Sequence, residues 1–143
     1  MIPPVPLRSE QLVDGKGSMA SNWFQFLEGL WRGDKGNDWT PTYSGLTETG
    51  AATHTARYFR VSASLYYVRI RVVPSTDTSS TAATTYLSNF PLTVPAMGTL
   101  QVLNETTLLP IGVAVVSTNG RIYPPTWTTV TAPITICGMI EAS

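Results

Sequence analysis

An alternation of side-chain types marks the clearest strand of this chain, at residues 65–73. Every second position there is occupied by Tyr, Val or Ile, and arginines fill two of the positions in between. Because successive side chains of a strand point to opposite faces, this period of two predicts a strand with two unlike faces. One face carries Tyr66, Val68, Ile70 and Val72, and the other carries Tyr67, Arg69 and Arg71.

Further short apolar runs, separated by prolines and turn residues, follow along the rest of the chain. Asn119-Gly120 lies between two such runs and is the strongest hairpin signal in the sequence. Residues 74–85 are mostly Ser and Thr and are predicted to form a long loop. The predicted strands are residues 53–62, 65–73, 86–90, 98–103, 111–117, 121–123 and 129–140, with a tight turn at Ala63-Ser64 joining the first two. This series predicts an all-β fold, a jelly-roll or TNF-like antiparallel β-sandwich.

The N-terminal part of the chain shows a different pattern. Pro3, Pro4 and Pro6 predict an extended arm over residues 1–17. A helical apolar stripe follows, which Gly33 and Gly36 end. Its residues are Trp23, Phe24, Phe26, Leu27, Leu30 and Trp31.

So short a helix needs packing partners, because an isolated helix of about two turns is marginal in water. Either the stripe packs on the chain's own β-core, or it contacts the same helix in neighbouring subunits or a larger assembly. We therefore expect two parts, an arm with a short helix at residues 1–36 and a β-sandwich domain at residues 37–143.

Charge narrows the classes of function. Nine basic and nine acidic side chains cancel in a chain of 143 residues, so no electrostatic surface for nucleic acid or for an anionic membrane is expected. No run of apolar residues is long enough to span a membrane, and the first residues do not resemble a signal peptide, which predicts synthesis and folding in a cytoplasm. The single thiol, Cys137, excludes an internal disulfide.

The charged residues are distributed unevenly. Of the nine basic and nine acidic side chains, all but four lie in residues 1–72. The four in residues 73–143 are Asp77, Glu105, Arg121 and Glu141. A segment with so little charge favours a homo-oligomer that covers part of its surface.

Candidate catalytic groups are few. His54 is the only imidazole, and its place in a predicted strand favours a surface or interface role over catalysis. Asp34 and Asp38 flank a Gly-Asn turn that lacks the alternating ligands of a calcium loop. We expect no enzyme activity, no metal site and no cofactor.

Aromatic and hydroxyl side chains are the remaining candidates for a ligand-binding site. Tyr86, Tyr123 and Trp127, with the Ser75 to Thr85 segment, are candidate contacts for a glycan, because aromatic faces stack on sugar rings and hydroxyls share hydrogen bonds with them. The alternative is that Tyr86 and Trp127 are core or subunit-interface residues.

The order of these parts resembles that of small fibre and spike proteins of tailed bacteriophages. The resemblance rests on the arm Leu7 to Gly17, the aromatic helix Asn22 to Leu27, and three segments of the β part. Those segments are Tyr67-Val68-Arg69-Ile70-Arg71-Val72-Val73-Pro74, Asn89-Phe90-Pro91 and Gly120-Arg121-Ile122-Tyr123-Pro124-Pro125-Thr126-Trp127.

The resemblance implies a homotrimer in the virion, whose arms bind capsid or tail proteins and whose β knobs project outward. On this interpretation Trp23, Phe26, Leu27, Leu30 and Trp31 carry assembly, and Tyr123 and Trp127 contact a host-surface glycan. One alternative is a capsid cement protein whose β domain clamps the shell. Another is a free carbohydrate-binding module or a lyase domain detached from a tailspike.

Overall fold

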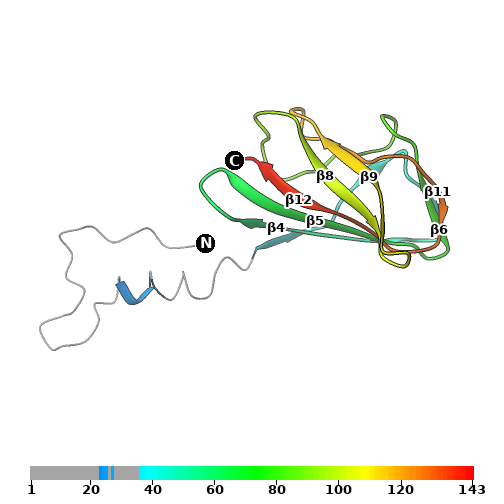
Figure 1. Ribbon diagram of the computed structural model, residues 1–143, viewed down its shortest axis with the longest axis horizontal. Helices are drawn as coiled ribbons and strands as arrows, with labels where there is room; N and C mark the ends of the chain where they lie inside the picture. The colour runs from blue at the N-terminus through cyan, green and yellow to red at the C-terminus, as the bar shows by residue number, and fades with distance from the viewer. Residues whose placement is uncertain (1–22, 26, 28–35) are drawn as a thin grey trace, which may run out of the picture. The chain divides into compact units, whose positions relative to one another are not determined.

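The computed structural model describes residues 23–25, 27 and 36–143 of the chain (Figure 1). The chain divides into two compact units, Met1–Lys35 and Gly36–Ser143. In the first unit, Trp23, Phe24, Gln25 and Leu27 are helical. The predicted arm and the stripe residues Phe26, Leu30 and Trp31 lie outside the described residues.

The second unit is all-β and antiparallel, as predicted. Its strands are β1 (Asn37–Trp39), β2 (Tyr43–Ser44), β3 (Thr47–Thr49), β4 (Thr53–Arg60), β5 (Leu65–Val73), β6 (Asp77–Ser80), β7 (Tyr86–Leu87), β8 (Gly98–Asn104), β9 (Leu109–Val116), β10 (Ile122–Tyr123), β11 (Trp127–Val130) and β12 (Ile134–Glu141). They form a nine-stranded sheet in the order β1-β4-β5-β12-β8-β9-β10-β7-β2 and a three-stranded sheet in the order β11-β6-β3.

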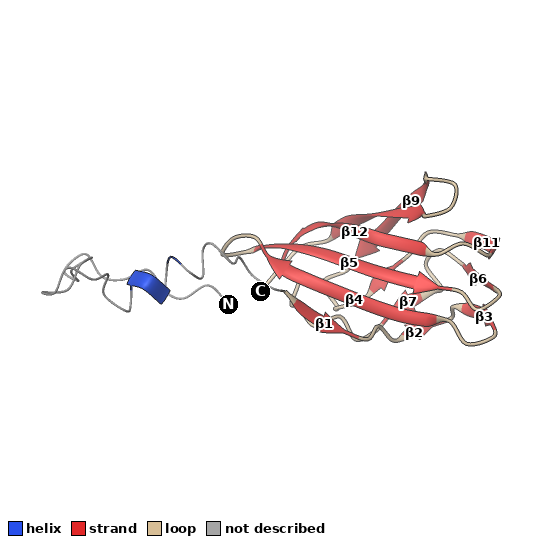
Figure 2. Cartoon of the chain, turned by 90° about the horizontal axis from the view of Figure 1, so that it is seen from below, coloured by secondary structure: helices blue, strands red, loops and turns tan. Residues whose placement is uncertain are grey.

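The large sheet curls over on itself to make the sandwich. Tyr43 in β2, at one end of the strand order, has its ring centroid 5.1 Å from that of His54 in β4, next to the other end. Trp39 in β1 likewise lies 5.8 Å from Phe90, which follows β7. The small sheet closes the end of the sandwich that lies away from the β4–β5 turn (Figures 1 and 2). The core is therefore enclosed between the two ends of one sheet.

Strands β5 and β12 are neighbours in the interior of the large sheet, and the alternation of side chains along each strand sets which residues are buried. β5 has the bounds that the sequence predicts, Leu65–Val73. Val68, Ile70 and Val72 are fully buried, while Arg69 and Arg71 on the opposite face are exposed. β12 repeats the pattern with Ile134, Ile136 and Ile140, which line the same core.

The Ser/Thr-rich segment departs from the predicted loop. Residues 77–80 form β6, which pairs with β3 and β11. Thr78, Ser80 and Thr85 are buried. The Thr85 hydroxyl donates to Gly45 O (3.0 Å), and the Thr78 hydroxyl accepts from the Trp127 indole N–H (3.1 Å). Small hydroxyl side chains occupy the inward positions of β6. The sequence of β6 therefore lacks the alternation of apolar and polar residues by which strands are predicted.

Two other predicted strands are shorter than expected. The run 129–140 is divided into β11 and β12, with Pro133 between them, because proline has no N–H for the ladder. The run 86–90 ends at Leu87, and the Asn89 side chain then bonds Thr40 O (2.7 Å) and Thr42 N (2.8 Å) in place of a strand partner.

The predicted hairpin at Asn119-Gly120 is confirmed. It joins β9 to β10, whose residues Val116 and Ile122 pair directly. Ser117 N donates to Arg121 O at 2.8 Å, and Gly120 has φ of +77°. A positive φ is accessible to glycine at little steric cost, which explains its place in the turn.

We expect Thr78→Val to lower the free energy of unfolding by about 1–3 kcal/mol, because valine keeps the shape of threonine but leaves the buried Trp127 N–H without an acceptor. Urea unfolding followed by tryptophan fluorescence measures the change. Thr99→Val, on the exposed face of β8, is the matched control and should shift stability by less than about 0.5 kcal/mol. Equal effects of the two substitutions would contradict the assigned role of the Thr78 hydroxyl.

Candidate functional site

Trp127 does not take part in an exposed binding surface, which corrects the expectation that it contacts a glycan. Its side chain belongs to the hydrophobic core and is only 4% exposed. The indole N–H is bound to Thr78, as described above. An indole whose faces are packed against core residues has no surface to offer a sugar ring. The core interpretation of this residue is therefore the correct one.

Tyr123 instead lies in a polar aromatic cluster, which also contains Tyr86, Asn119 and Arg121. The centroids of the two tyrosine rings are 5.8 Å apart, and the rings are tilted by 48°. The Arg121 guanidinium carbon lies 4.3 Å from the Tyr86 centroid. Asn119 Nδ2 donates to the Tyr123 hydroxyl at 3.5 Å.

The hairpin and the strand alternation explain this cluster. In β10, Ile122 points into the core opposite Leu87 of β7. The residues next to these two, Arg121, Tyr123 and Tyr86, therefore lie on the outer side. Asn119 is held in the turn because its Oδ1 accepts a hydrogen bond from Arg121 N at 3.0 Å.

Hydrogen bonding changes the ionisation of this cluster. The pKa of Tyr123 is lowered, first by the hydrogen bond from Asn119 and then by that from Arg121. The pKa of Arg121 is raised, mainly by its hydrogen bond to Tyr123. The cluster thus combines aromatic surface with guanidinium, amide and phenol groups that exchange hydrogen bonds. Groups of this kind can exchange hydrogen bonds with sugar hydroxyls and pack against sugar rings.

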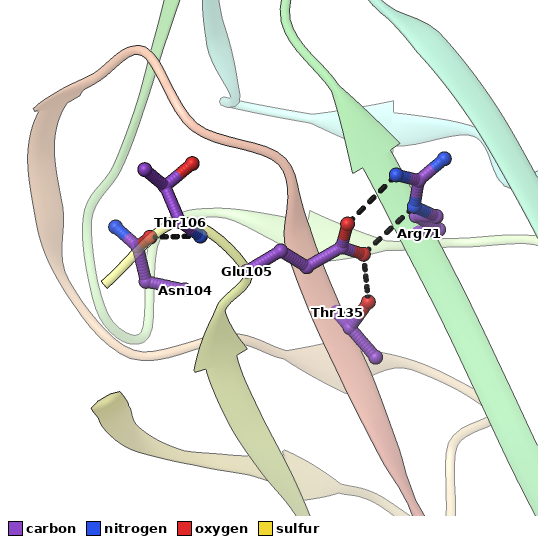
Figure 3. Close-up of polar contacts among 5 residues, drawn as sticks. All are labelled: Arg71, Asn104, Glu105, Thr106 and Thr135. Carbon is purple, nitrogen blue, oxygen red and sulfur yellow. Dashed lines mark hydrogen bonds and ion pairs between the residues drawn. The ribbon is translucent and has the colours of Figure 1, made fainter. Parts of the chain in front are cut away.

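A second polar network crosses the outer face of the large sheet (Figure 3). Glu105, directly after β8, accepts two hydrogen bonds of 2.7 Å from Nε and Nη2 of Arg71 in β5. It accepts a third, of 2.5 Å, from the Thr135 hydroxyl in β12. These contacts connect three strands that are adjacent in the sheet. The hydrogen bonds from Arg71 and Thr135 lower the pKa of Glu105 to about 2.

Two of the remaining candidate groups, His54 and Asp38, form ion pairs with residues of other strands. His54 Nε2 contacts Glu48 Oε1, which connects β4 to β3 and so joins the two sheets. Asp38 pairs with Arg57, whereas Asp34 lies outside the described residues. Cys137 is a free, half-buried thiol. Within the part of the chain that the structure describes, no three His, Cys, Asp or Glu side chains gather as metal ligands.

No helix among the described residues is long and apolar enough to cross a membrane. Comparisons of the chain with protein-family models, with curated proteins and with solved structures found no match.

Sequence reasoning identified Tyr86 and Tyr123 as candidates but missed Arg121 and Asn119. A local signal for both existed, because a residue two positions before Tyr123 in a strand shares its face, and the hairpin turn supplies the asparagine. The Glu105–Arg71 pair had no such signal. Its members are separated by 34 residues in sequence and meet only through the order of the strands.

We expect Glu105→Gln to cost about 1–2 kcal/mol of stability at pH 7, since charged hydrogen bonds are lost at a partly exposed site. The folded pKa of about 2 lies below the ordinary 4.5. The ionised carboxylate therefore stabilises the fold above about pH 4.5, and this contribution disappears as the pH falls towards 2.

Urea unfolding between pH 7 and pH 2 measures the difference between the wild-type protein and the variant, which should shrink across the acid range. Glu141→Gln removes the same charge from an exposed position near the end of β12 and serves as the control. A difference that stays constant with pH would show that the carboxylate is not the stabilising group.

Proposed function

We propose that this chain is a non-enzymatic structural protein of a bacteriophage virion, a short trimeric head or tail fibre. The N-terminal unit anchors the protein to the particle, and the β unit is displayed for attachment to the host surface. The resemblance of the arm, the helix and the hairpin segment to phage fibre proteins supports the class. The division of the chain into two compact units supports the separation of the two tasks.

The observation that carries the assembly role is the exposure of apolar side chains on the N-terminal helix. Phe24 is 55% exposed and Leu27 is 40% exposed in the single chain. Large apolar side chains that remain open on a short helix favour contact with another molecule. We assign this contact to the helices of two further copies and to capsid or tail proteins.

The polar aromatic cluster is the better candidate for the host glycan within the proposed knob. Tyr86, Arg121 and Tyr123 have half-buried or exposed side chains that are already ordered by mutual contacts. These side chains therefore lose little conformational entropy when a ligand binds to them. Trp127, in the core, has no part in this proposal.

A capsid cement protein is the second candidate, and a specific observation favours it. The β unit itself exposes large apolar side chains, among them Leu108 (82%) and Leu109 (63%) in and beside the β8–β9 turn. A cement protein would bury such a surface against the shell, whereas a fibre touches the shell only through its N-terminal part.

The trimer is tested by light scattering of the purified chain, which should return about three times the 15.5 kDa of one copy. Replacing Phe24 and Leu27 together by Ser should give monomers, because the shared apolar contact is removed. Met97→Ser, at an exposed apolar side chain of the β unit, is the control and should leave the trimer intact. A monomeric wild-type protein at micromolar concentration would rule out the trimeric fibre.

Deletion of residues 1–35 tests the anchor. We expect the remaining unit to keep its β circular-dichroism spectrum and cooperative unfolding but to be absent from purified virions, because the part that binds the particle is gone. Normal incorporation of the truncated chain would refute the anchor assignment.

A double substitution in the full chain, Leu108→Ser with Leu109→Ser, separates the fibre from the cement protein. A fibre should be incorporated normally with these substitutions, whereas a cement protein should lose occupancy.

A further inference from the structure

Three arginines lie close together on the outer face of the large sheet. Arg57 in β4 and Arg69 in β5 are directly opposite each other in the ladder. Arg71 follows two residues along β5, on the same face. Like charges placed directly opposite on neighbouring strands destabilise a sheet. The arrangement therefore calls for compensating negative charge.

The protein supplies only part of that charge. Arg57 Nε lies 2.9 Å from Asp38 Oδ1, in an ion pair without good hydrogen-bond geometry. Arg71 is bound in the two-pronged contact with Glu105. Arg69 is exposed, and no described carboxylate lies within 4.0 Å of its guanidinium. Three guanidinium groups thus share two carboxylates.

A surface hollow lies at these arginines. Its volume is about 160 Å³, and it is lined by Asp38, Thr55, Ala56, Arg57, Arg69 and Arg71. A second hollow of about 410 Å³ shares Asp38, Thr55 and Ala56 with the first and continues to Trp39 and Thr40. The two hollows therefore adjoin, and we call them together the groove; its arginines line the first hollow, and Asp38 and Thr55 line both.

We propose that this groove binds an acidic saccharide, with the carboxylate of one sugar held by Arg69 beside Arg57. The guanidinium fork matches a carboxylate in geometry, and Arg69 has its donors available. Thr40, Thr55 and Asp38 offer hydrogen-bonding groups for the hydroxyls of that sugar and of its neighbour. This deepens the proposed host attachment by naming the class of glycan and a site apart from Tyr86 and Tyr123.

A saccharide fits the groove better than a protein segment does. Protein interfaces depend on large apolar side chains at their centre. Of the apolar side chains that line the groove, Ala56 is small and buried, and Trp39 packs inward against Tyr58 and Phe90. The groove consequently offers polar contacts and positive charge but little apolar surface.

The test is titration of the purified full chain with tri-galacturonic acid, followed by calorimetry and by NMR. We expect binding that weakens with added salt and perturbs the resonances of Thr55 and Arg69. Arg69→Gln should weaken it by about tenfold or more, since a charged hydrogen-bonded contact is lost. The melting temperature should not fall, because the substitution also removes the repulsion from Arg57.

Two further variants make the test specific. Arg69→Lys keeps the charge but loses the planar fork, so it should bind with intermediate affinity. Arg60→Gln removes the same charge at the C-terminal end of β4, outside the groove lining. Arg60 bonds there to Ser62 O and Ala63 O, and the substitution should leave the affinity unchanged.

The proposal is overturned if tri-galacturonic acid does not bind, if Arg69→Gln binds it as tightly as the wild-type chain, or if neutral trigalactose binds equally well. Inorganic phosphate that binds as tightly as the acidic trisaccharide would overturn the assignment to a saccharide. These measurements need no virion. A monomeric chain or a failed incorporation experiment would refute the fibre and leave this result standing.

Discussion

The position of β12 between β5 and β8 is the constraint on which the rest of the β unit depends. Ile134 to Cys137 pair with β5 on one side and with β8 on the other, so one strand joins the first half of the sheet to the second. β12 is the last strand of the sandwich along the chain, and its partner β5 begins about 70 residues earlier. The pairing of β5 and β8 with their common neighbour is complete only when β12 is in place. Because such pairing is non-local, we expect folding to be slow compared with that of helical domains of the same size.

Buried hydroxyl side chains occur in and shortly after β6 of the small sheet. Thr78, Ser80 and Thr85 lie where apolar residues would usually be expected, and they are buried. Threonine tolerates this position because its branched shape suits a strand and its hydroxyl finds a partner within the fold. Three of the hydroxyl side chains in this segment are thus interior residues, although the sequence pattern predicted a surface loop throughout.

A strand and a turn that depend on neighbouring residues along the chain were predicted correctly from local patterns. Alternation located β5 to the residue, and Asn119-Gly120 located the hairpin, because both depend on neighbours along the chain. Pro133 was a local signal of the same kind, because proline has no N–H for the ladder, and the predicted strand 129–140 ran through it. The binding candidates follow the same rule. Arg121 beside Tyr123 was readable from spacing, whereas the opposition of Arg57 and Arg69 depends on a register that no short motif specifies.

The large sheet also ends in unusually short strands. Its outermost members are β1, with three residues, and β2, with two, while the strands of seven to nine residues all lie inside the sheet. An unpaired strand edge is a template for the backbone of another copy, and the length of the edge sets how many hydrogen bonds a stray pairing gains. The two outermost strands themselves therefore offer only two or three residues each for pairing with another copy. Short outermost strands of this kind limit the backbone hydrogen bonds that those two strands can form with a second sheet.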